Sequence, residues 1–183
     1  LHPRIKILNP GPGVGGHCIS VDPWFLVEAA PELTPLIYHS RMVNDAQPNF
    51  VVETVNRVLG SLAGKKIAAL GLAYKPDVDD LRESPADNVI HLLQEQGAQV
   101  MTWEPFKPDA NLPGIDMASS LEEAIKDADA IVLLVKHTEF ANFNPEEIAK
   151  KTKARIVIDT VNGWNSEAWK IAGFEIHCLG VNK

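Results

Sequence analysis

Cysteine is scarce in this sequence, long apolar runs are missing, and positive charge is outnumbered by negative charge. Only Cys18 and Cys178 are present, far apart, which favours a cytoplasmic protein with free thiols over a disulfide framework. Six histidines are scattered, without the closely spaced ligands of a metal site. No apolar run is long enough to span a bilayer, and no signal-peptide pattern is present. The net charge of −7 argues against nucleic acid or an anionic membrane as the main partner.

The length and composition are those of an ordinary globular protein. The chain has 183 residues, of which 45% are hydrophobic and 22% are charged, so one or two domains with a real core are expected. It begins at Leu1 rather than at a methionine, and its most distinctive loop lies close to that end. Because such loops are normally held by structure on both sides, we expect the chain to be the C-terminal part of a longer protein.

The segment 9–26 carries most of the functional information. It holds glycines and prolines, then Cys18, and then an apolar stretch typical of a helix. Glycine lets a backbone adopt positive φ and approach a ligand closely. A cysteine just before a helix start lies near the positive end of the helix dipole, which favours the nucleophilic thiolate. We therefore expect Cys18 to do covalent chemistry, with a buried structural thiol as the alternative, whereas Cys178 in an apolar strand is expected to be structural.

The same segment fits the pattern Gly11-x-Gly13-x-x-Gly16 of a dinucleotide-binding turn. That fingerprint requires a helix that opens at the third glycine and an acidic residue at the end of a second strand about 20 residues further on. Here His17 and Cys18 follow instead, and no strand-like segment carries the acid. The sequence therefore favours a loop wrapped around a substrate.

Two helices are expected after this loop. Asp22 before a proline is typical of an N-cap, so a short helix should cover 24–30. A second helix should run from Pro35 to Gly60, with apolar residues near the 3.6-residue period and a kink or break at Pro48. A long amphipathic helix of this kind joins domains or forms an oligomer interface, although a core helix of one domain fits the pattern equally well.

From Lys65 onward, strands and helices alternate. Helix starts are indicated by Ser84, by Asn144 and by a capping box of Ser120 with Glu123. The expected strands are 66–71, 98–103, 130–135, 155–159 and 174–179, and the expected helices are 85–96, 121–126 and 145–150. Alternation predicts a parallel sheet, whose ligands lie beyond the carboxyl ends of the strands. That edge should carry 71–75, 103–104, 136–137 and 159–162.

Several charged residues are candidates for ligand contacts. Lys75, at the carboxyl end of a strand, is placed to meet an anionic ligand, and Arg82 beside a helix start suits a phosphate. The alternatives are a solvated charge for Lys75 and a surface ion pair for Arg82. Asp22 fits a helix cap, a catalytic group that holds water, or both. His17 is a weak candidate base for Cys18, because adjacent side chains usually diverge.

Two long motifs resemble the UDP-glucose/GDP-mannose dehydrogenase family: residues 10–25 (PGPGVGGHCISVDPWF) and residues 70–85 (LGLAYKPDVDDLRESP). The form of 16–25 is similar to that of members that oxidise UDP-N-acetyl-mannosamine. The resemblance covers the whole chain but only the C-terminal part of the family's protein. It implies an α/β fold: a Rossmann-like, parallel-sheet, UDP-sugar-binding C-terminal domain at 63–183. The cysteine loop and the long helix of an all-α central dimerisation region would precede it at 1–62.

The resemblance also implies the chemistry. Such enzymes oxidise the C6 alcohol of a nucleotide sugar to a carboxylate with two NAD molecules in succession. Cys18 would hold the sugar as a thiohemiacetal and then as a thioester, which water hydrolyses. The expected partners are a UDP-N-acetyl-hexosamine substrate and a second copy of the chain, in a homodimer formed through the long helix. Because the NAD site would lie mostly in a missing N-terminal domain, the piece alone is expected to be inactive.

Individual roles follow from the same resemblance. Asp22 would position or activate water, and Tyr74 and Lys75 would contact the substrate. Arg82 would reach the NAD pyrophosphate across a domain interface, and Arg4 would reach the sugar nucleotide of a neighbouring subunit. The glycines of the loop would pack against the sugar and nucleotide: Gly13, Gly15 and Gly16.

Several departures from the family's pattern accompany this interpretation, together with alternatives: the N-terminal domain is missing, and so are the lysine and asparagine that would partner the cysteine. Many family members place arginine in the turn after the late strand, where Asp159-Thr-Val-Asn162 has valine, so the role of this turn is left open. UDP-glucose and UDP-N-acetyl-glucosamine are alternative substrates. A stand-alone sugar-nucleotide-binding or dimerisation module is a different class of function. A cysteine hydrolase would require partners for Cys18 that the sequence does not indicate.

Overall fold

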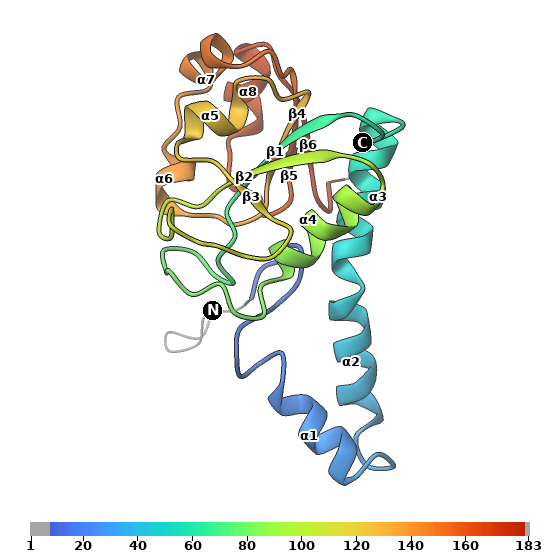
Figure 1. Cartoon of the computed structure of the whole chain (residues 1–183). Helices are drawn as coiled ribbons and strands as arrows, with labels where there is room; N and C mark the ends of the chain where they lie inside the picture. The colour runs from blue at the N-terminus through green and yellow to red at the C-terminus, as the bar shows by residue number, and fades with distance from the viewer. Residues whose placement is uncertain (1–7, 182–183) are drawn as a thin grey trace.

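The computed structural model describes residues 8–181. Its centre is a six-stranded, all-parallel sheet with strand order β3-β2-β1-β4-β5-β6 (Figure 1). The strands are β1 (Lys66–Leu70), β2 (Gln99–Trp103), β3 (Asp116–Met117), β4 (Ala130–Leu133), β5 (Ile156–Asp159) and β6 (Glu175–Cys178). The α/β class expected from the alternation of strands and helices is therefore confirmed, and the strand order is that of a Rossmann-like sheet.

Helices precede, connect and cover the strands. They are α1 (Asp22–Ala29), α2 (Pro35–Asp45), α3 (Gln47–Leu59), α4 (Pro85–Glu95), α5 (Leu121–Ile125), α6 (Thr138–Ala141), α7 (Pro145–Lys151) and α8 (Ser166–Ile171). Among residues 8–181, no helix is long and apolar enough to cross a membrane.

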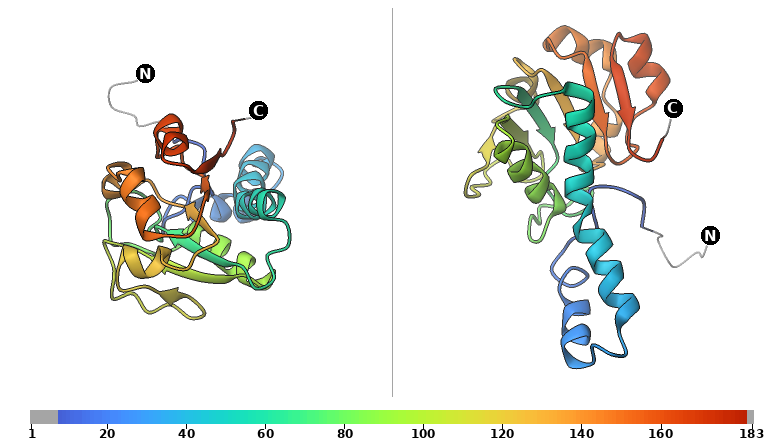
Figure 2. Two further views of the ribbon diagram at one scale, coloured as in Figure 1. Left: turned by 90° about the horizontal axis from the view of Figure 1, so that it is seen from above. Right: turned by 90° about the vertical axis from the view of Figure 1, so that its right-hand side faces the viewer.

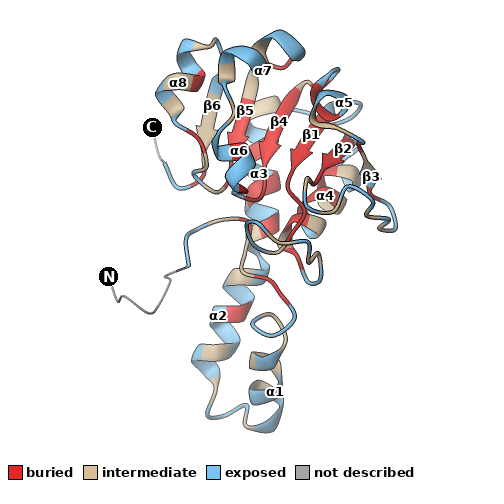
Figure 3. Ribbon diagram, turned by 90° about the vertical axis from the view of Figure 1, so that its left-hand side faces the viewer, coloured by how far each residue is buried: buried red, intermediate tan, exposed pale blue. Residues whose placement is uncertain are grey.

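The central strands are apolar on both faces because both faces are covered. In β1, Ile67 and Ala69 join one core cluster, and Ala68 and Leu70 join the other, as the alternation of side chains across a strand requires. The first cluster includes the buried faces of α3 and α4, and the second includes buried residues of α5, α7 and α8. Figure 3 shows the buried strands between these two layers.

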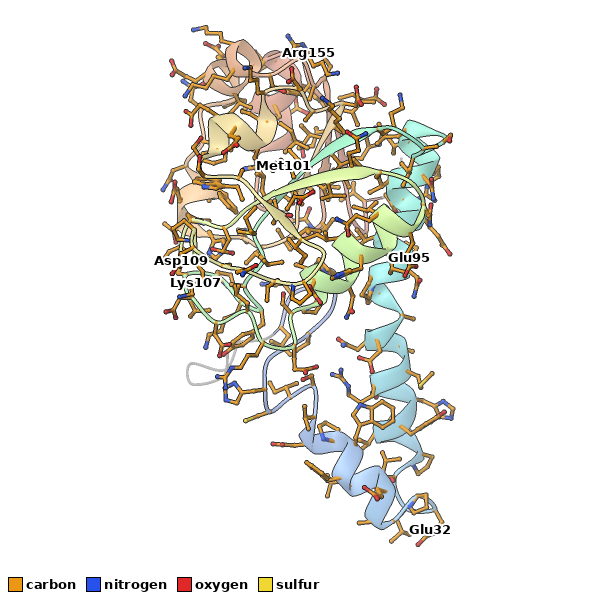
Figure 4. All side chains as sticks on the ribbon, viewed as in Figure 1. Glu32, Glu95, Met101, Lys107, Asp109 and Arg155 are labelled. Carbon is orange, nitrogen blue, oxygen red and sulfur yellow. The ribbon has the colours of Figure 1, made fainter. Side chains whose placement is uncertain are left out.

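The helices α1 and α2 form a hairpin that projects from the α/β body (Figures 1 and 2). Glu32, in the turn between them, lies at the tip, and Arg155 lies at the opposite end of the molecule (Figure 4). The helix α1 has no buried residue. Large apolar side chains are exposed along the hairpin and the first turn of α3: Phe25, Leu26, Leu33, Leu36, Tyr38, Met42, Val43 and Phe50.

The break expected at Pro48 is confirmed. The helix α2 ends at Asp45 and α3 begins at Gln47, with Pro48 in its first turn, where a missing backbone N–H costs no hydrogen bond. The apolar face of α3 packs into the same core as α4 and β1, through Val51 and Val55 among others. The division of the chain between residues 62 and 63 stays a prediction.

Most expected helix caps are confirmed. The side chains of Ser84 and Asn144 accept hydrogen bonds from Ala86 N and Glu146 N. The side chain of Ser120 accepts from Glu123 N, but the Glu123 carboxylate accepts from Ser119 rather than completing the box with Ser120.

The prediction that Asp22 caps α1 is wrong. Asp22 is the first helical residue, Val21 occupies the cap position, and no side chain caps this helix. The amides of Val21 and Asp22 instead donate to the carbonyl of Cys18, so the preceding turn satisfies the backbone groups that a cap would bind.

A buried carboxylate links three strand ends. Glu104 follows β2 and is 0% exposed. Its Oε2 accepts from Leu72 N (2.7 Å), Ala73 N (2.9 Å) and His137 Nε2 (3.0 Å), and its Oε1 accepts from Phe106 N (3.0 Å). The loops after β1, β2 and β4 are therefore fastened to one another at the carboxyl edge of the sheet.

The imidazole of His137 extends this network. Its Nδ1 accepts from Asp77 N at 2.9 Å, which leaves Nε2–H as the donor to Glu104. The carboxylate of Asp77 in turn accepts from Thr138 N (2.8 Å) and Thr138 Oγ1 (2.7 Å), and these bonds hold its pKa below the ordinary value. The loop after β1 is thus tied at a second point.

Burial alone would raise the pKa of Glu104, but hydrogen bonds from His137, Leu72 N and Phe106 N outweigh it. The pKa of this carboxyl therefore lies below its ordinary value of 4.5. Because the folded pKa is lowered, the ionised group stabilises the fold above the ordinary pKa. That contribution is lost as the pH falls through the folded pKa.

The substitution Glu104→Gln should lower the free energy of unfolding at pH 7 by about 1–3 kcal/mol, because an amide NH2 would face N–H donors. The difference from the parent at pH 7 should be smaller at a pH below 4.5, where the parent carboxyl takes up a proton as the pH falls through its lowered pKa. Urea unfolding at both pH values measures this. The control Glu53→Gln, on an exposed site of α3, should change stability by less than about 0.5 kcal/mol. A Glu104→Gln protein as stable as the parent at pH 7 would contradict the prediction.

Candidate functional site

A cavity of about 240 Å³ lies at the carboxyl edge of the sheet, where β1 and β4 are neighbours and their connections run in opposite directions. Three parts of the chain line it: the loop before α1, the connection between β1 and α4, and the residues after β4 and β5. The lining residues are Leu8, Asn9, Pro10, Gly11, Pro12, Gly13, Val14, Ala73, Tyr74, Lys75, Pro76, Ser84, Pro85, Ala86, Leu134, Val135, Lys136 and Val161. The edge expected from the strand pattern is therefore where the cavity forms.

Two lysines stand at this cavity. Lys75 Nζ lies 5.1 Å from the centre of the Tyr74 ring, in cation–π geometry. Lys136 Nζ donates to the carbonyl of Asn162 at 2.9 Å. Both lysines are exposed. An apolar wall with ammonium groups at its edge suits an anionic ligand that also carries a flat or apolar part.

The cysteine loop rests on the α/β body through its glycines. Gly16 N donates to the carbonyl of Glu83 at 3.1 Å. A Cβ added to Gly15 would overlap that same carbonyl oxygen, and one added to Gly16, whose φ is +96°, would lie 2.7 Å from the Tyr74 ring. Gly15 and Gly16 are therefore required by contact within the protein, whereas Gly11 and Gly13 line the cavity.

Cys18 is exposed in the turn before α1. Its carbonyl accepts from Val21 N (3.0 Å) and Asp22 N (2.8 Å), so the amides at the start of α1 point toward the residue that carries the thiol. Asp22 is exposed and is linked to Cys18 through the backbone. Within residues 8–181, no group of three or more His, Cys, Asp or Glu side chains is arranged to hold a metal ion.

An ionic cluster adjoins the cysteine. Arg82 donates from Nε (2.9 Å) and Nη2 (2.7 Å) to the carboxylate of Asp80, and its Nη2 lies 3.3 Å from His17 Nδ1. Hydrogen bonds from the side chain and backbone of Arg82 hold the pKa of Asp80 well below its usual range. The bond to Asp80 also raises the pKa of Arg82, and smaller contributions come from Tyr74 and Cys18, so these groups lie within electrostatic reach of the guanidinium.

Cys178 and Asp159 make their contacts within the protein rather than at the cavity. Cys178 is half-buried, and its Sγ lies 3.3 Å from Ser166 Oγ. The buried carboxylate of Asp159 accepts from the backbone N–H groups of Val161, Gly163 and Trp164, so it organises the turn that follows β5. Arg4 lies outside the described residues.

The glycines of the cysteine loop do not form a dinucleotide-binding turn. The pattern Gly11-x-Gly13-x-x-Gly16 lies before α1 rather than between β1 and α4, where a Rossmann turn holds its pyrophosphate. Glu104, at the end of β2 where such a site presents its ribose-binding acid, already accepts hydrogen bonds from protein groups at both oxygens. The interpretation of these glycines as something other than a dinucleotide turn therefore agrees with the structure.

Sequence reasoning placed Glu104 and His137 at the sheet edge but gave them no role. The signal was present: Glu104 directly follows an apolar strand, and His137 stands two residues after the apolar run 130–135. Their pairing could be found only from the strand order, which places β2 and β4 on either side of β1 and so brings the ends of both strands close together.

Two family models match this chain. The UDP-binding domain of the UDP-glucose/GDP-mannose dehydrogenase family matches residues 68–166, and the central domain of the same family matches residues 1–46. A curated relative from Methanocaldococcus jannaschii, UDP-N-acetyl-D-mannosamine dehydrogenase, is 44% identical across 100% of this chain and 42% of its own length. NDP-N-acetyl-D-galactosaminuronic acid dehydrogenase of Ralstonia solanacearum is 43% identical across 91% of this chain and 39% of its own.

Solved structures agree in fold. UDP-D-ManNAc dehydrogenase from Pyrococcus horikoshii superposes with a TM-score of 0.80 at 34% identity, over 98% of this chain and 41% of that one. NDP-N-acetyl-D-galactosaminuronic acid dehydrogenase from Methanosarcina mazei Go1 superposes with a TM-score of 0.84 at 29% identity, over 96% of this chain and 40% of that one. The chain spans about two fifths of the length of these relatives. From these matches and from the fold, the chain belongs to the UDP-glucose/GDP-mannose dehydrogenase family.

Proposed function

We propose that this chain is the C-terminal part of an NAD-dependent nucleotide-sugar 6-dehydrogenase. The observation that carries the proposal is the position of the cysteine loop: its first residues line the cavity at the sheet edge, and the ring of His17, next to Cys18, makes an edge contact with the ring of Tyr74 from the cavity wall. UDP-N-acetyl-D-mannosamine is the preferred candidate substrate, because several of the similar proteins bear that name.

The cavity is proposed to bind the nucleotide end of the substrate. The ammonium group of Lys75 and the ring of Tyr74 would contact the ligand, and Lys136 adds a second positive charge for the diphosphate. Gly13 belongs to the cavity wall, so it would contact the ligand itself. Gly15 and Gly16 would act by letting the loop lie close to the body.

Cys18 is proposed as the nucleophile. Its thiolate would add to the C6 aldehyde carbon, and the resulting thiohemiacetal, once oxidised, becomes a thioester that water cleaves to the carboxylate. Asp22 is proposed to position that water, because its backbone N–H is bonded to the Cys18 carbonyl at the start of α1.

The hydride acceptor is proposed to be NAD bound by another part of the complete enzyme. Glu104 supports this proposal, because both of its carboxylate oxygens already accept hydrogen bonds from the protein, where a Rossmann site would offer an acid to the ribose. Arg82, exposed beside Cys18, would face the NAD pyrophosphate across a domain interface. Arg4 is proposed to reach the sugar nucleotide of a neighbouring subunit.

A homodimer through the long helix is proposed as well. Leu36, Met42 and Val43 of α2 are 78%, 47% and 65% exposed, which is a large apolar area for a free helix. Covering these side chains in a partner would remove that area from water.

The chain should bind UDP, and Lys75→Met should weaken this binding about tenfold, since it removes an ammonium group from the cavity. Isothermal titration calorimetry measures the affinity. The control Lys107→Met, on a lysine of the β2–β3 loop that is labelled in Figure 4 and pairs with Asp109, should change it by less than about twofold. Equal losses in both variants would argue against a nucleotide site at this cavity.

Incubation of the chain with NAD and UDP-N-acetyl-mannosamine should produce no NADH, because the described residues offer no dinucleotide site. Absorbance at the NADH band checks this. Clear turnover by these 183 residues would overturn the proposal that the cofactor site lies elsewhere.

Iodoacetamide should alkylate exposed Cys18 faster than half-buried Cys178, and saturating UDP-N-acetyl-mannosamine should slow the Cys18 reaction at least about fivefold. Mass spectrometry of peptides separates the two thiols, with Cys178 as the internal control. Binding of the nucleotide sugar without any protection of Cys18 would favour the alternative of a binding module and would contradict the assignment of Cys18 as nucleophile.

A further inference from the structure

The helix α2 has an inverted pattern of burial. Its apolar residues Leu36, Met42 and Val43 are exposed, and within α2, which the structure describes in full, Arg41 is the one buried residue. An arginine on a surface helix is rarely buried unless it has polar partners inside the protein. The groups that face Arg41 are backbone carbonyls of the cysteine loop.

Arg41 joins the two sides of the loop. Its side chain is 9% exposed, and Nη1 donates to the carbonyls of Val14 (3.4 Å) and Ile19 (3.3 Å). Its Nη2 pairs with Asp45 one turn further along α2, which orients the guanidinium. Val14 precedes Cys18 by four residues and Ile19 follows it directly, so one side chain contacts both flanks of the thiol-bearing turn.

Asn44 holds the same loop through both the oxygen and the nitrogen of its side-chain amide. Its Oδ1 accepts from Val14 N at 2.7 Å, and its Nδ2 donates to the Val14 carbonyl at 3.1 Å. This reciprocal pair fixes the backbone on both sides of Val14, which a side chain with only a donor or only an acceptor would not do. Within the loop, Ser20 Oγ donates to the Gly16 carbonyl and makes the turn around Cys18 rigid.

Packing alone would not hold the loop there. A cavity of about 300 Å³ lies among the loop, α2 and the start of α4, with Val14, Gly15, Ser20 and Val21 on the loop side and Arg41 and Asn44 on the helix side. The loop therefore has room to move on that side if the polar contacts are lost. On the opposite side, contacts with the α/β body support the loop, among them the hydrogen bond from Gly16 N to the Glu83 carbonyl and the packing of Gly16 against Tyr74.

We infer that Arg41 and Asn44 are positioning residues, which fasten the Cys18 loop to α2 from both flanks and so set where the thiol lies relative to the cavity. The inference rests on the proposed function, because it gives these contacts a consequence at the proposed nucleophile. The helix α2 thereby has two roles. Its exposed apolar face is available for a partner, and its polar face, with Arg41 and Asn44, holds the loop.

Asn44→Ala and Arg41→Met test this in the 183-residue chain. Hydrogen exchange of the peptide covering 14–21 should become at least about tenfold faster in both variants, because the Val14 amide loses its acceptor or the loop loses its anchor. Arg41→Lys, which keeps one donor for the carbonyls, should restore part of the protection. Glu53→Ala, an exposed site on α3, is the control and should leave the exchange unchanged.

The functional readout is the protection of Cys18 from iodoacetamide by UDP-N-acetyl-mannosamine. In Asn44→Ala and Arg41→Met, protection should fall at least about threefold while the rate at which iodoacetamide alkylates half-buried Cys178 stays within about twofold of the parent. A general loss of fold would instead expose Cys178 and speed its alkylation, so the two readouts together separate positioning from unfolding.

The outcomes separate the two proposals. If the parent shows no protection of Cys18, the proposed function fails, and the exchange experiment still tests the contacts of α2. If the parent is protected and both variants retain full protection with unchanged exchange at 14–21, the inference about Arg41 and Asn44 is wrong.

Discussion

The arrangement at the sheet edge depends on the buried carboxylate of Glu104. A parallel sheet leaves backbone N–H groups at its carboxyl edge that must find acceptors away from water. Glu104 accepts from Leu72 and Ala73 after β1 and from His137 after β4, and it thus fastens these loops to one another. Tyr74 and Lys75 follow directly in the same connection. Their place at the cavity is therefore a consequence of a charge that lies inside the protein.

The cysteine loop adds a second layer to this edge. Gly15 and Gly16 bring the loop within a distance of the Glu83 carbonyl and the Tyr74 ring that no side chain tolerates. From the other side, α2 offers Arg41 and Asn44 to the loop backbone. The loop is thus held between the α/β body and the projecting helix, and the orientation of Cys18 depends on both. This explains why a helix with an apolar outer face carries a polar inner one.

Much of the fold followed from local patterns, and the exceptions share a cause. Five strands and the caps at Ser84 and Asn144 were predicted because apolar runs and capping residues act within a few positions. The helix α8 was missed, although Asn165 caps it, because six residues make less than two turns and give no clear period. The two-residue strand β3 owes its existence to pairing with β2, which no local pattern records. Asp22 was expected to cap α1 because a proline follows it. In the structure the carbonyl of Cys18 already accepts from the amides of Val21 and Asp22.

The sequence by itself determined the alternation of strands and helices, the loop that presents Cys18, and the positions of Tyr74, Lys75 and Arg82 next to strand or helix ends. These features depend on residue types at short spacing. The tertiary structure alone decided that Glu104 and His137 pair, that Arg82 lies against Asp80 and His17, and that α2 holds the loop through Arg41 and Asn44. Those contacts join residues up to 65 positions apart. Their partners are set by strand order and loop packing, which only the folded chain brings together.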